Sequence, residues 1–546
     1  MHRNPRTALG THDVTNQPPP LEDVNLFAAD AILQSAVAWS GAGVHRARLD
    51  AFGARVGAAE TQERRRQANA HPPVFRPFDR YGRRIDEVEF HPAYHELMAL
   101  GLGAGVSGAA WNVASNGHAL HAALLFLMGQ ADHGVCCPMS MTYAVVPALR
   151  IEPGVAKEWV PRATSETYDP RFVPAGEKRG ATLGMAMTEK QGGSDVRANT
   201  TRAFRDADGA YRLVGHKWFC SAPMSDAFLT LAYVDGAMTC FLVPRWRPDG
   251  ERNGFEIQRL KDKLGDRSNA SSEIEYRDAY ALRVGEEGRG IRTIIEMVQL
   301  ARLDCVIGAA SQMREAASLA LWHAAGRSAF QRRLIDQPLM RAVLADLALD
   351  VEAAVALAFR LAQALDRAGS DPREAALARI GLPLAKYLTT KRAPTVVVEA
   401  MECHGGAGYV EESPLPRLFR QSPLNAIWEG SGNVIALDTL RALGREKESA
   451  AALLHELGSA AKAEPAMRPV LQEAEGLLGS AAGETAARGL SERLALAFAA
   501  AVLVQTAPGE IARAFIDGRI ASQSLTFGAR PSAATDALVA RATLQA

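Results

Sequence analysis

The chain has 546 residues, of which 48% are hydrophobic and 22% are charged, a composition typical of a globular protein with several domains. Lys plus Arg and Asp plus Glu each number 61, so the formal net charge of +0 excludes a global argument for nucleic-acid or membrane binding. The six cysteines include no C-x-x-C pair, which gives no support for a zinc site or a disulfide scaffold and favours a reducing, cytoplasmic location.

Helix-like apolar spacing in the first third of the chain predicts an N-terminal helical domain over residues 1–180. Residues 1–20 are polar and proline-rich and lack the apolar core of a signal peptide. A buried helix is predicted over residues 117–127. The run Arg64-Arg65-Arg66 predicts a solvated helix face, with a phosphate contact as the alternative.

The residue pattern changes in the middle of the chain and predicts a central β-domain over residues 181–284. Short segments rich in β-branched or aromatic residues are separated by turn residues such as Asp208-Gly209 and Asp235-Gly236. Such a meander is typical of a small sandwich or barrel. The strands are expected at residues 211–215, 227–234, 238–243 and 272–276.

Long Ala- and Leu-rich segments follow and predict a C-terminal helical bundle over residues 285–445. Residues 446–546 predict an additional helical domain with its own Pro and Gly breaks. The longest apolar run, 494–504, is too short to span a bilayer, so we expect a buried helix there and no membrane association. The predicted fold class is therefore mainly α with a central β-domain.

Three glycine-containing elements are candidates for chemistry, and the first precedes the strand region. In Met187 to Asp195 the pair Gly192-Gly193 lets the backbone approach a ligand, and its free N–H groups could bind phosphate or ring carbonyls. Thr188 and Ser194 add hydroxyl donors. A plain turn is the alternative interpretation.

The second element is Gly215 to Ser221. Trp218 on a strand is either a core residue or an aromatic platform that covers a flat cofactor. For His216 the sequence favours a polar position at the end of a turn over a catalytic role.

The third element pairs Met401 to Tyr409 with Ile427 to Asn433. Cys403 and His404 lack a spacing that positions a base, so nucleophilic catalysis is not favoured. Glu429 lies between Trp428 and a flexible Gly-Ser-Gly turn. Desolvation beside the indole would raise the pKa of a carboxyl toward neutral pH, as a general base requires.

Taken in this order, the three elements resemble the acyl-CoA dehydrogenase family. The resemblance implies the acyl-CoA dehydrogenase fold, FAD as cofactor, no metal, and Glu429 as the base that deprotonates an acyl-CoA thioester. It also implies a homotetramer in which glycines of one subunit approach the FAD of another. The implied FAD-binding residues are Met187, Thr188, Gly193, Ser194, Trp218, Phe219, Cys220, Ser221, Arg327, Phe330, Gln337, Gly405, Gly406, Trp428, Ser431 and Asn433. One departure is Gln331, where the family pattern Arg-x-x-Phe-Gly has glycine.

Further segments resemble one branch of this family, the flavoproteins of the adaptive response to DNA alkylation. They are Asn16 to Pro20, Cys137 to Thr142, Met187 to Val196, Arg259 to Ser271, Glu411 to Ser413 and Ile427 to Asn433. The branch implies weak isovaleryl-CoA-type activity and double-stranded DNA bound through residues 446–546. Residues 441–546 nevertheless carry eleven Lys or Arg and eleven Asp or Glu. Two alternatives follow: a short/branched-chain acyl-CoA dehydrogenase without a DNA role, and a DNA-associated module in which FAD only stabilises the fold.

Overall fold

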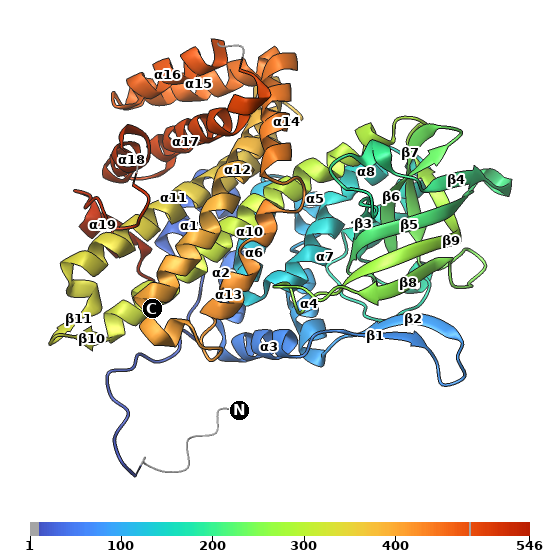
Figure 1. Cartoon of the computed structure of the whole chain (residues 1–546), viewed down its shortest axis with the longest axis horizontal. Coiled ribbons are helices and arrows are strands. Elements are labelled where there is room, and N and C mark those ends of the chain that lie inside the picture. The colour runs from blue at the N-terminus through green and yellow to red at the C-terminus, as the bar shows by residue number, and fades with distance from the viewer. Residues whose placement is uncertain (1–9, 480–481, 523, 546) are drawn as a thin grey trace.

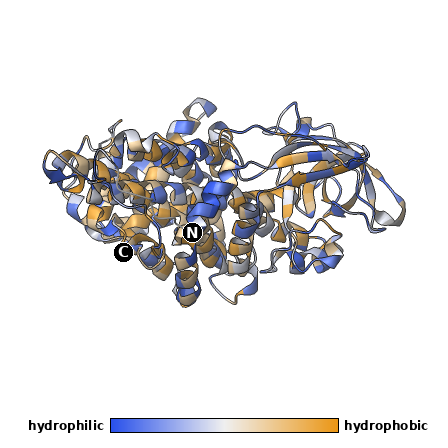
Figure 2. Ribbon diagram, turned by 90° about the horizontal axis from the view of Figure 1, so that it is seen from below, coloured by the Kyte–Doolittle hydropathy of each residue, from blue (hydrophilic) through white to orange (hydrophobic). Residues whose placement is uncertain are grey.

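The computed structural model describes residues 10–479, 482–522 and 524–545. A β-domain stands at one side of a larger helical body, and the helices of the C-terminal segment lie across the opposite part of that body (Figure 1). Hydrophobic residues follow the packed helices and strands, whereas many connecting loops are hydrophilic (Figure 2). The predicted fold class, mainly α with a central β-domain, is confirmed.

The N-terminal part is helical except for one hairpin of β1 (Val74–Phe78) and β2 (Arg84–Glu89). The sequence did not reveal this hairpin because its strands contain Pro77 and several charged residues and are largely solvent-facing. The helix α6 is buried along almost its whole length, which confirms the helix expected at 117–127. The helices are α1 (Ala31–Trp39), α2 (Arg46–Gly57), α3 (Ala59–Ala70), α4 (Pro92–Ala104), α5 (Ala109–Asn112), α6 (Gly117–Ala131), α7 (His133–Ala144), α8 (Val146–Arg150) and α9 (Pro153–Ala163).

The expectation that Arg64-Arg65-Arg66 forms a solvated face is wrong for Arg65. Its guanidinium is buried on α3, where Nη1 lies 2.8 Å from Glu315 Oε1 and donates to the carbonyl of Gln130 at 2.8 Å. Arg66 does remain exposed beside Glu63. A buried arginine needs a partner, and this one lies 250 residues away in sequence.

The strands of the β-domain close into a barrel. β4 pairs with β5, β5 with β9, β9 with β7 and β7 with β6, and β6 returns to β4. The four expected strands are found as β5, β6, β7 and β9, whereas short or charged β3, β4 and β8 were not predicted. The bounds are β3 (Leu183–Ala186), β4 (Arg202–Arg205), β5 (Tyr211–Ser221), β6 (Ala227–Val234), β7 (Ala237–Pro244), β8 (Phe255–Leu260) and β9 (Ser271–Val284).

Three long helices form the bundle that follows. They are α10 (Gly290–Gly326), α11 (Pro338–Arg367) and α12 (Pro372–Cys403), with the small hairpin of β10 (Ser328–Ala329) and β11 (Arg332–Arg333) between the first two. Shorter elements complete the region: the 3₁₀ turn η6 (Gly405–Gly408), α13 (Leu415–Gln421), the 3₁₀ turn η7 (Leu424–Ala426) and α14 (Gly432–Arg445).

The C-terminal segment shares the hydrophobic core of the bundle. Residues 494–503 of α17 are buried against α11 and α12, which confirms the expected buried helix. The predicted domain limits, including the one at residue 445, stay predictions. Among the described residues, no helix is long and apolar enough to cross a membrane. The elements are α15 (Lys447–Ala463), α16 (Met467–Gly479), α17 (Ala487–Thr506), α18 (Gly509–Phe515), the π-helical turn η9 (Ile516–Ala521) and α19 (Thr535–Ala542).

A buried arginine joins the two ends of the chain to the bundle. Arg314 of α10 is 0% exposed, and its Nε lies 2.7 Å from Asp30 Oδ2. Its Nη1 donates to the carbonyl of Ala542, at the end of α19, at 2.8 Å. Asp30 also caps α1 by accepting from the backbone N–H groups of Ile32 and Leu33.

We predict that Arg314→Met lowers the free energy of unfolding by about 3–5 kcal/mol, because it leaves the buried carboxylate of Asp30 without its cation. The matched control Arg66→Met removes an exposed ion pair and should cost less than about 1 kcal/mol. Denaturant unfolding of both variants checks the difference. Equal effects would mean that the Arg314 contact does not hold the ends of the chain in place.

Candidate active site

Glu429 lies in a tight turn between η7 and α14. Its backbone has φ +55°, in the left-handed region, and Gly430 follows with φ +105°. A non-glycine residue in this conformation costs about 1–3 kcal/mol and persists only where surrounding contacts fix it. The turn therefore needs strong anchors.

Two buried cations supply these anchors. Lys386 of α12 donates from Nζ to the carbonyls of Asn425 at 3.0 Å and Gly430 at 2.9 Å. Arg302 of α10 donates from Nε to the carbonyl of Glu429 at 3.2 Å. Together the two cations bind three backbone oxygens in and around the turn. These contacts fix the backbone that carries the Glu429 side chain.

The neighbours of the turn extend this frame. Arg302 Nη1 is 2.7 Å from Asp438 Oδ2 on α14, and the Trp428 indole donates to Asn425 Oδ1 at 2.9 Å. Trp428 packs against an apolar cluster that includes Cys137 of α7 and Leu183 of β3. The turn thus faces the boundary between the helical body and the β-domain.

The electrostatics of Glu429 suit a base that works near neutral pH. The side chain keeps a partial contact with solvent but is deeply set among protein atoms. Burial raises the pKa of its carboxyl to about 7, opposed by the charges of Lys386 and Arg302 and assisted by that of Asp304. A carboxylate with this pKa can accept a proton readily and release it again.

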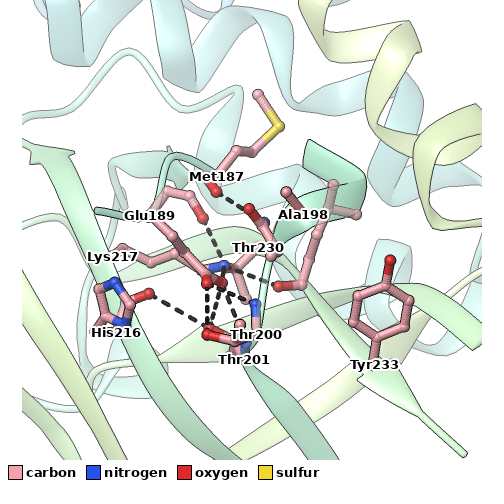
Figure 3. A network of polar contacts seen from close by, with 12 residues as sticks. Met187, Glu189, Ala198, Thr200, Thr201, His216, Lys217, Thr230 and Tyr233 are labelled. Atoms are coloured by element: carbon pink, nitrogen blue, oxygen red, sulfur yellow. Dashed lines mark hydrogen bonds and ion pairs between the residues drawn. The ribbon is translucent and has the colours of Figure 1, made fainter. Parts of the chain in front are cut away.

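The loop that the sequence singled out, Met187 to Asp195, is anchored from behind by a buried carboxylate (Figure 3). Glu189 accepts from the hydroxyl of Thr201 at 2.6 Å, from the backbone N–H of Thr200 at 2.7 Å and from Lys217 Nζ at 2.8 Å. His216 accepts from the backbone N–H of Lys190 at 3.0 Å, so it is a structural tether on β5.

The Glu189 and Lys217 side chains are both 0% exposed. Burial alone would raise the pKa of Glu189, but the Lys217 ammonium and the hydrogen bonds from Thr201 and Thr200 outweigh it and lower the pKa to about 2. Lys217 also donates to the carbonyl of Leu231 at 3.0 Å. The pair fixes the loop against strands β5 and β6.

The loop presents donors that fit a flavin nucleotide. Thr188 is partly exposed and Ser194 is exposed, and neither hydroxyl has a hydrogen-bond partner within residues 10–479, 482–522 and 524–545. A Cβ at Gly193 would lie 2.4 Å from Thr188 Oγ1, so only glycine allows this path. Hydroxyl and backbone donors on a glycine turn are the groups that bind ring carbonyls and phosphate oxygens.

Trp218 and Phe219 follow the loop on β5, because the Trp218 backbone N–H donates to the Thr188 carbonyl at 2.8 Å. Trp218 is partly exposed and Phe219 is 50% exposed. Lys261 Nζ lies 3.2 Å from the centroid of the Trp218 ring and covers one of its faces. Lys190 Nζ and the Arg259 guanidinium also lie over this ring, at 5.6 and 5.8 Å from its centroid, so Trp218 is surrounded by cations.

Cys220 and Ser221 have different surroundings. The Cys220 thiol is buried in the core of the β-domain, and burial raises its pKa to about 12. Ser221 lies 3.2 Å from Ser271 Oγ and within hydrogen-bonding reach of the Cys137 thiol, which also feels the charge of Glu429. Cys137 thus connects the end of β5 to the Glu429 turn.

Five of the predicted FAD contacts are not near this loop in a single chain. Phe330 lies in the turn of the β10–β11 hairpin, and Arg327 and Gln337 flank that hairpin, which lies at the end of the helical body opposite the β-domain (Figure 1). The Gly405-Gly406 turn adjoins the same end, since the rings of His323 and His404 are 4.4 Å apart.

Two further predicted FAD contacts, Ser431 and Asn433, lie where α14 begins. Ser431 precedes the helix at its N-cap position, and its side chain makes no capping hydrogen bond. Asn433 accepts from Arg488 of α17 at 3.3 Å. Both residues immediately follow the Glu429 turn.

Several functional residues were not identified from sequence. Arg302 and Lys386 act on backbone carbonyls of a distant segment, which leaves no sequence signal. Glu189 and Lys217 stand inside the quoted motifs, but only their burial reveals their pairing. Within the described residues, no group of three His, Cys, Asp or Glu side chains is arranged to hold a metal ion.

Comparisons with known proteins identify the family. Three family models match: the adaptive response protein AidB N-terminal domain at residues 16–170, the acyl-CoA dehydrogenase middle domain at 184–279, and the acyl-CoA dehydrogenase C-terminal domain at 288–444. The chain is 49% identical to the putative acyl-CoA dehydrogenase AidB of Escherichia coli (strain K12), covering 80% of this chain and 81% of that protein.

Two matches come from Caenorhabditis elegans. Acyl-CoA dehydrogenase family member 11 is 33% identical over 72% of this chain and 66% of that protein. The crystal structure of ACDH-11 in complex with C11-CoA superposes with a TM-score of 0.83 and 27% identity, covering 94% of this chain and 93% of that one. The family matches and the fold define an FAD-dependent acyl-CoA dehydrogenase. The chain belongs to this family, and within it to the AidB type.

We predict that Lys217→Met costs about 3–5 kcal/mol of stability at pH 7, because Glu189 stays buried without its cation. The folded-state pKa of Glu189, about 2, lies below its ordinary value of 4.5. The stabilisation by the pair is therefore fully present above about pH 4.5 and is lost as the pH falls toward 2.

The difference between wild type and Lys217→Met should accordingly shrink below about pH 4.5. Denaturant unfolding over a range of pH measures it, with exposed Lys190→Met as the control in the same loop. A difference that is independent of pH would rule out the ion pair as its source.

Proposed function

We propose that Glu429 is the active-site base of this acyl-CoA dehydrogenase. The observation that carries the proposal is a carboxylate on a left-handed turn, fixed by Lys386 and Arg302, with a pKa raised to about 7. It faces the boundary between the bundle and the β-domain, where the Met187–Ser194 loop and Trp218 provide the donors and the aromatic surface for the flavin ring.

In this mechanism the Glu429 carboxylate takes the proton from the α-carbon of an acyl-CoA thioester. FAD held by the Met187–Ser194 loop and Trp218 would supply the acceptor for the hydride that leaves the β-carbon, so that an α,β-double bond would remain in the substrate. Lys386 and Arg302 keep the carboxylate in place through the backbone, and their charges favour its ionised form before the reaction. The partly buried setting limits competing water around the base.

For the substrate we propose a short or branched acyl group of the isovaleryl type, with weak turnover, on the basis of the AidB relationship. The alternative is a fully active short/branched-chain dehydrogenase without a DNA role. The ligand in the ACDH-11 structure is C11-CoA, which makes longer acyl chains a necessary comparison.

We also propose a cytoplasmic homotetramer. The support for an oligomer is that the β10–β11 hairpin lies at the far end of the helical body, away from β3 and the Met187–Ser194 loop that follows it (Figure 1). A second copy that brings its β10–β11 hairpin and Gly405-Gly406 turn to the flavin loop of the first would complete the site. The large exposed side chains of Phe330, Leu339 and Tyr409 at this end are suited to such a contact.

Glu429→Gln should abolish flavin bleaching by acyl-CoA and leave FAD content unchanged, because the amide cannot accept the α-proton. The measurement is the oxidised-flavin absorbance under anaerobic conditions during titration with isovaleryl-CoA, butyryl-CoA and longer acyl-CoAs. Dithionite reduction of both proteins is the control. Bleaching of the variant at the wild-type rate would exclude Glu429 as the base.

The rate of bleaching at limiting isovaleryl-CoA should rise with pH and level off above about pH 7. The base acts only when ionised, and burial raises the pKa of Glu429 to about 7. Stopped-flow kinetics between pH 5.5 and 8.5 checks the profile. A rate that is constant across this range would contradict the assigned ionisation.

Association with double-stranded DNA as part of the alkylation response is a further part of the proposal, and it rests on the AidB relationship. Of the eleven Lys or Arg in residues 441–546, six form no ion pair with a described residue: Arg445, Lys447, Lys462, Arg468, Arg488 and Arg530. These cations remain available for phosphate contacts.

We expect fluorescence anisotropy to show duplex binding that weakens as salt increases, with a log–log slope of about −0.9 for each phosphate contacted. The control is a different acyl-CoA dehydrogenase that has the same net charge and no segment equivalent to residues 446–546. This control should not bind the duplex. If no duplex binding occurs even at low salt, the dehydrogenase without a DNA role is the correct alternative.

A further inference from the structure

The β10–β11 hairpin closes through an unusually strained turn. Ser328 pairs with Arg333 and Ala329 with Arg332, which leaves a two-residue loop of Phe330 and Gln331. These residues have φ +51° and +64°. Two-residue loops with both φ values positive favour Asn-Gly and similar pairs, because other side chains are strained there.

The turn also exposes its aromatic residue. Phe330 is 96% exposed, although burial of a phenylalanine is normally favourable. Strain and apolar exposure at one position are typical of a segment that is held ready for a contact outside its own chain. The hairpin itself is only two residues long on each side, so it cannot hold this shape alone.

Gln337 Nε2 donates to the Ala329 carbonyl at 2.9 Å, and an N-terminal segment adds further support. The Asn16 side chain donates from Nδ2 to the Ser328 carbonyl at 2.8 Å and accepts from the Ser328 N–H at 2.7 Å. The Asn16 side chain thereby pairs with the backbone N–H and C=O of Ser328 as a neighbouring strand would. The Asn16 carbonyl also accepts from Arg327 Nη1 at 3.0 Å.

Asn16 is well suited to this position. Its own φ is +56°, a conformation that asparagine adopts more readily than most residues. The next residues, Gln17 to Pro20, form a strap that is rigid through its prolines and docked on α10. The Trp322 indole donates to the Pro19 carbonyl at 2.8 Å, and Gly326 leaves room for Pro18.

The strap also connects the hairpin with the glycine turn. Between the strap and the ends of α10 and α12 lies a cavity of about 1120 Å³. Its lining includes Pro18, Trp322, His323, His404 and Ala407. The strap and the Gly405–Gly408 turn therefore border one cavity at this end of the molecule.

We propose that Asn16 is a positioning residue that locks the strained Phe330-Gln331 turn, so that Arg327 and Phe330 are presented to the FAD of a neighbouring subunit. This inference rests on the proposed function, because it takes the hairpin as an FAD contact. The strap compensates for the absence of glycine at position 331, where the strained backbone needs an external clamp.

The test compares three variants of the full-length FAD-loaded protein. Asn16→Gly keeps the left-handed backbone accessible but removes both contacts to Ser328. Val14→Gly adds the same flexibility to the segment at a side chain that is 70% exposed. Gln331→Gly, combined with Asn16→Gly, removes the strain that the clamp opposes.

We expect Asn16→Gly to speed FAD release roughly tenfold, as the loss of two hydrogen bonds implies, and to increase amide exchange of residues 327–333. Val14→Gly should change neither quantity. The double variant should regain slow release and slow exchange. FAD fluorescence on dilution and hydrogen-exchange mass spectrometry measure the two effects.

The proposal is overturned if Asn16→Gly leaves FAD release unchanged, or if Gln331→Gly gives no rescue. Exchange that rises without faster FAD release would show a clamp that does not serve the flavin, which also overturns it. Failure of Glu429 as the base would leave these FAD-release results intact, so the two hypotheses fail separately.

Discussion

The position of Glu429 depends on two buried cations that bind backbone carbonyls. Lys386 and Arg302 join the turn to α12 and α10, and these contacts stabilise the left-handed conformation of Glu429. The same charges oppose the effect of burial on the carboxyl. Burial raises the pKa of Glu429 to about 7 and the two cations act against this rise, so the same residues fix the position and the basicity of the carboxyl.

Buried charge fixes other loops of the molecule in a similar way. The Glu189–Lys217 pair holds the Met187–Ser194 loop against the barrel, and Arg314 joins α1, through Asp30, and α19, through the Ala542 carbonyl, to α10. Buried ions contribute specificity of arrangement when every partner is present, at the cost of strong destabilisation when one is removed. The helical body and the barrel thus provide rigid supports, and the reactive groups lie on short segments attached to them.

Sequence patterns predicted what depends on local composition. The strands β6 and β7 are apolar and β-branched, and the Gly-Ser-Gly turn after Glu429 is a strong local signal. Sequence patterns failed where contacts between distant residues determine burial or loop position. The Arg64-Arg65-Arg66 run looks solvated, yet Arg65 is buried by Glu315 from α10. The Glu429 turn is held through its backbone oxygens. Part of the support of the β10–β11 hairpin comes from Asn16, which is 312 residues away from Ser328 in the sequence.

The most direct test is a titration of the Glu429 carboxyl itself. Infrared difference spectra between wild type and Glu429→Gln, with ¹³C-labelled glutamate to shift the band, follow the protonated carboxyl as pH changes. We expect a single band, absent from the variant, that is lost as the pH rises through about 7. Loss of the band near pH 4.5, the ordinary value for glutamate, would show that the turn does not create a base tuned to neutral pH.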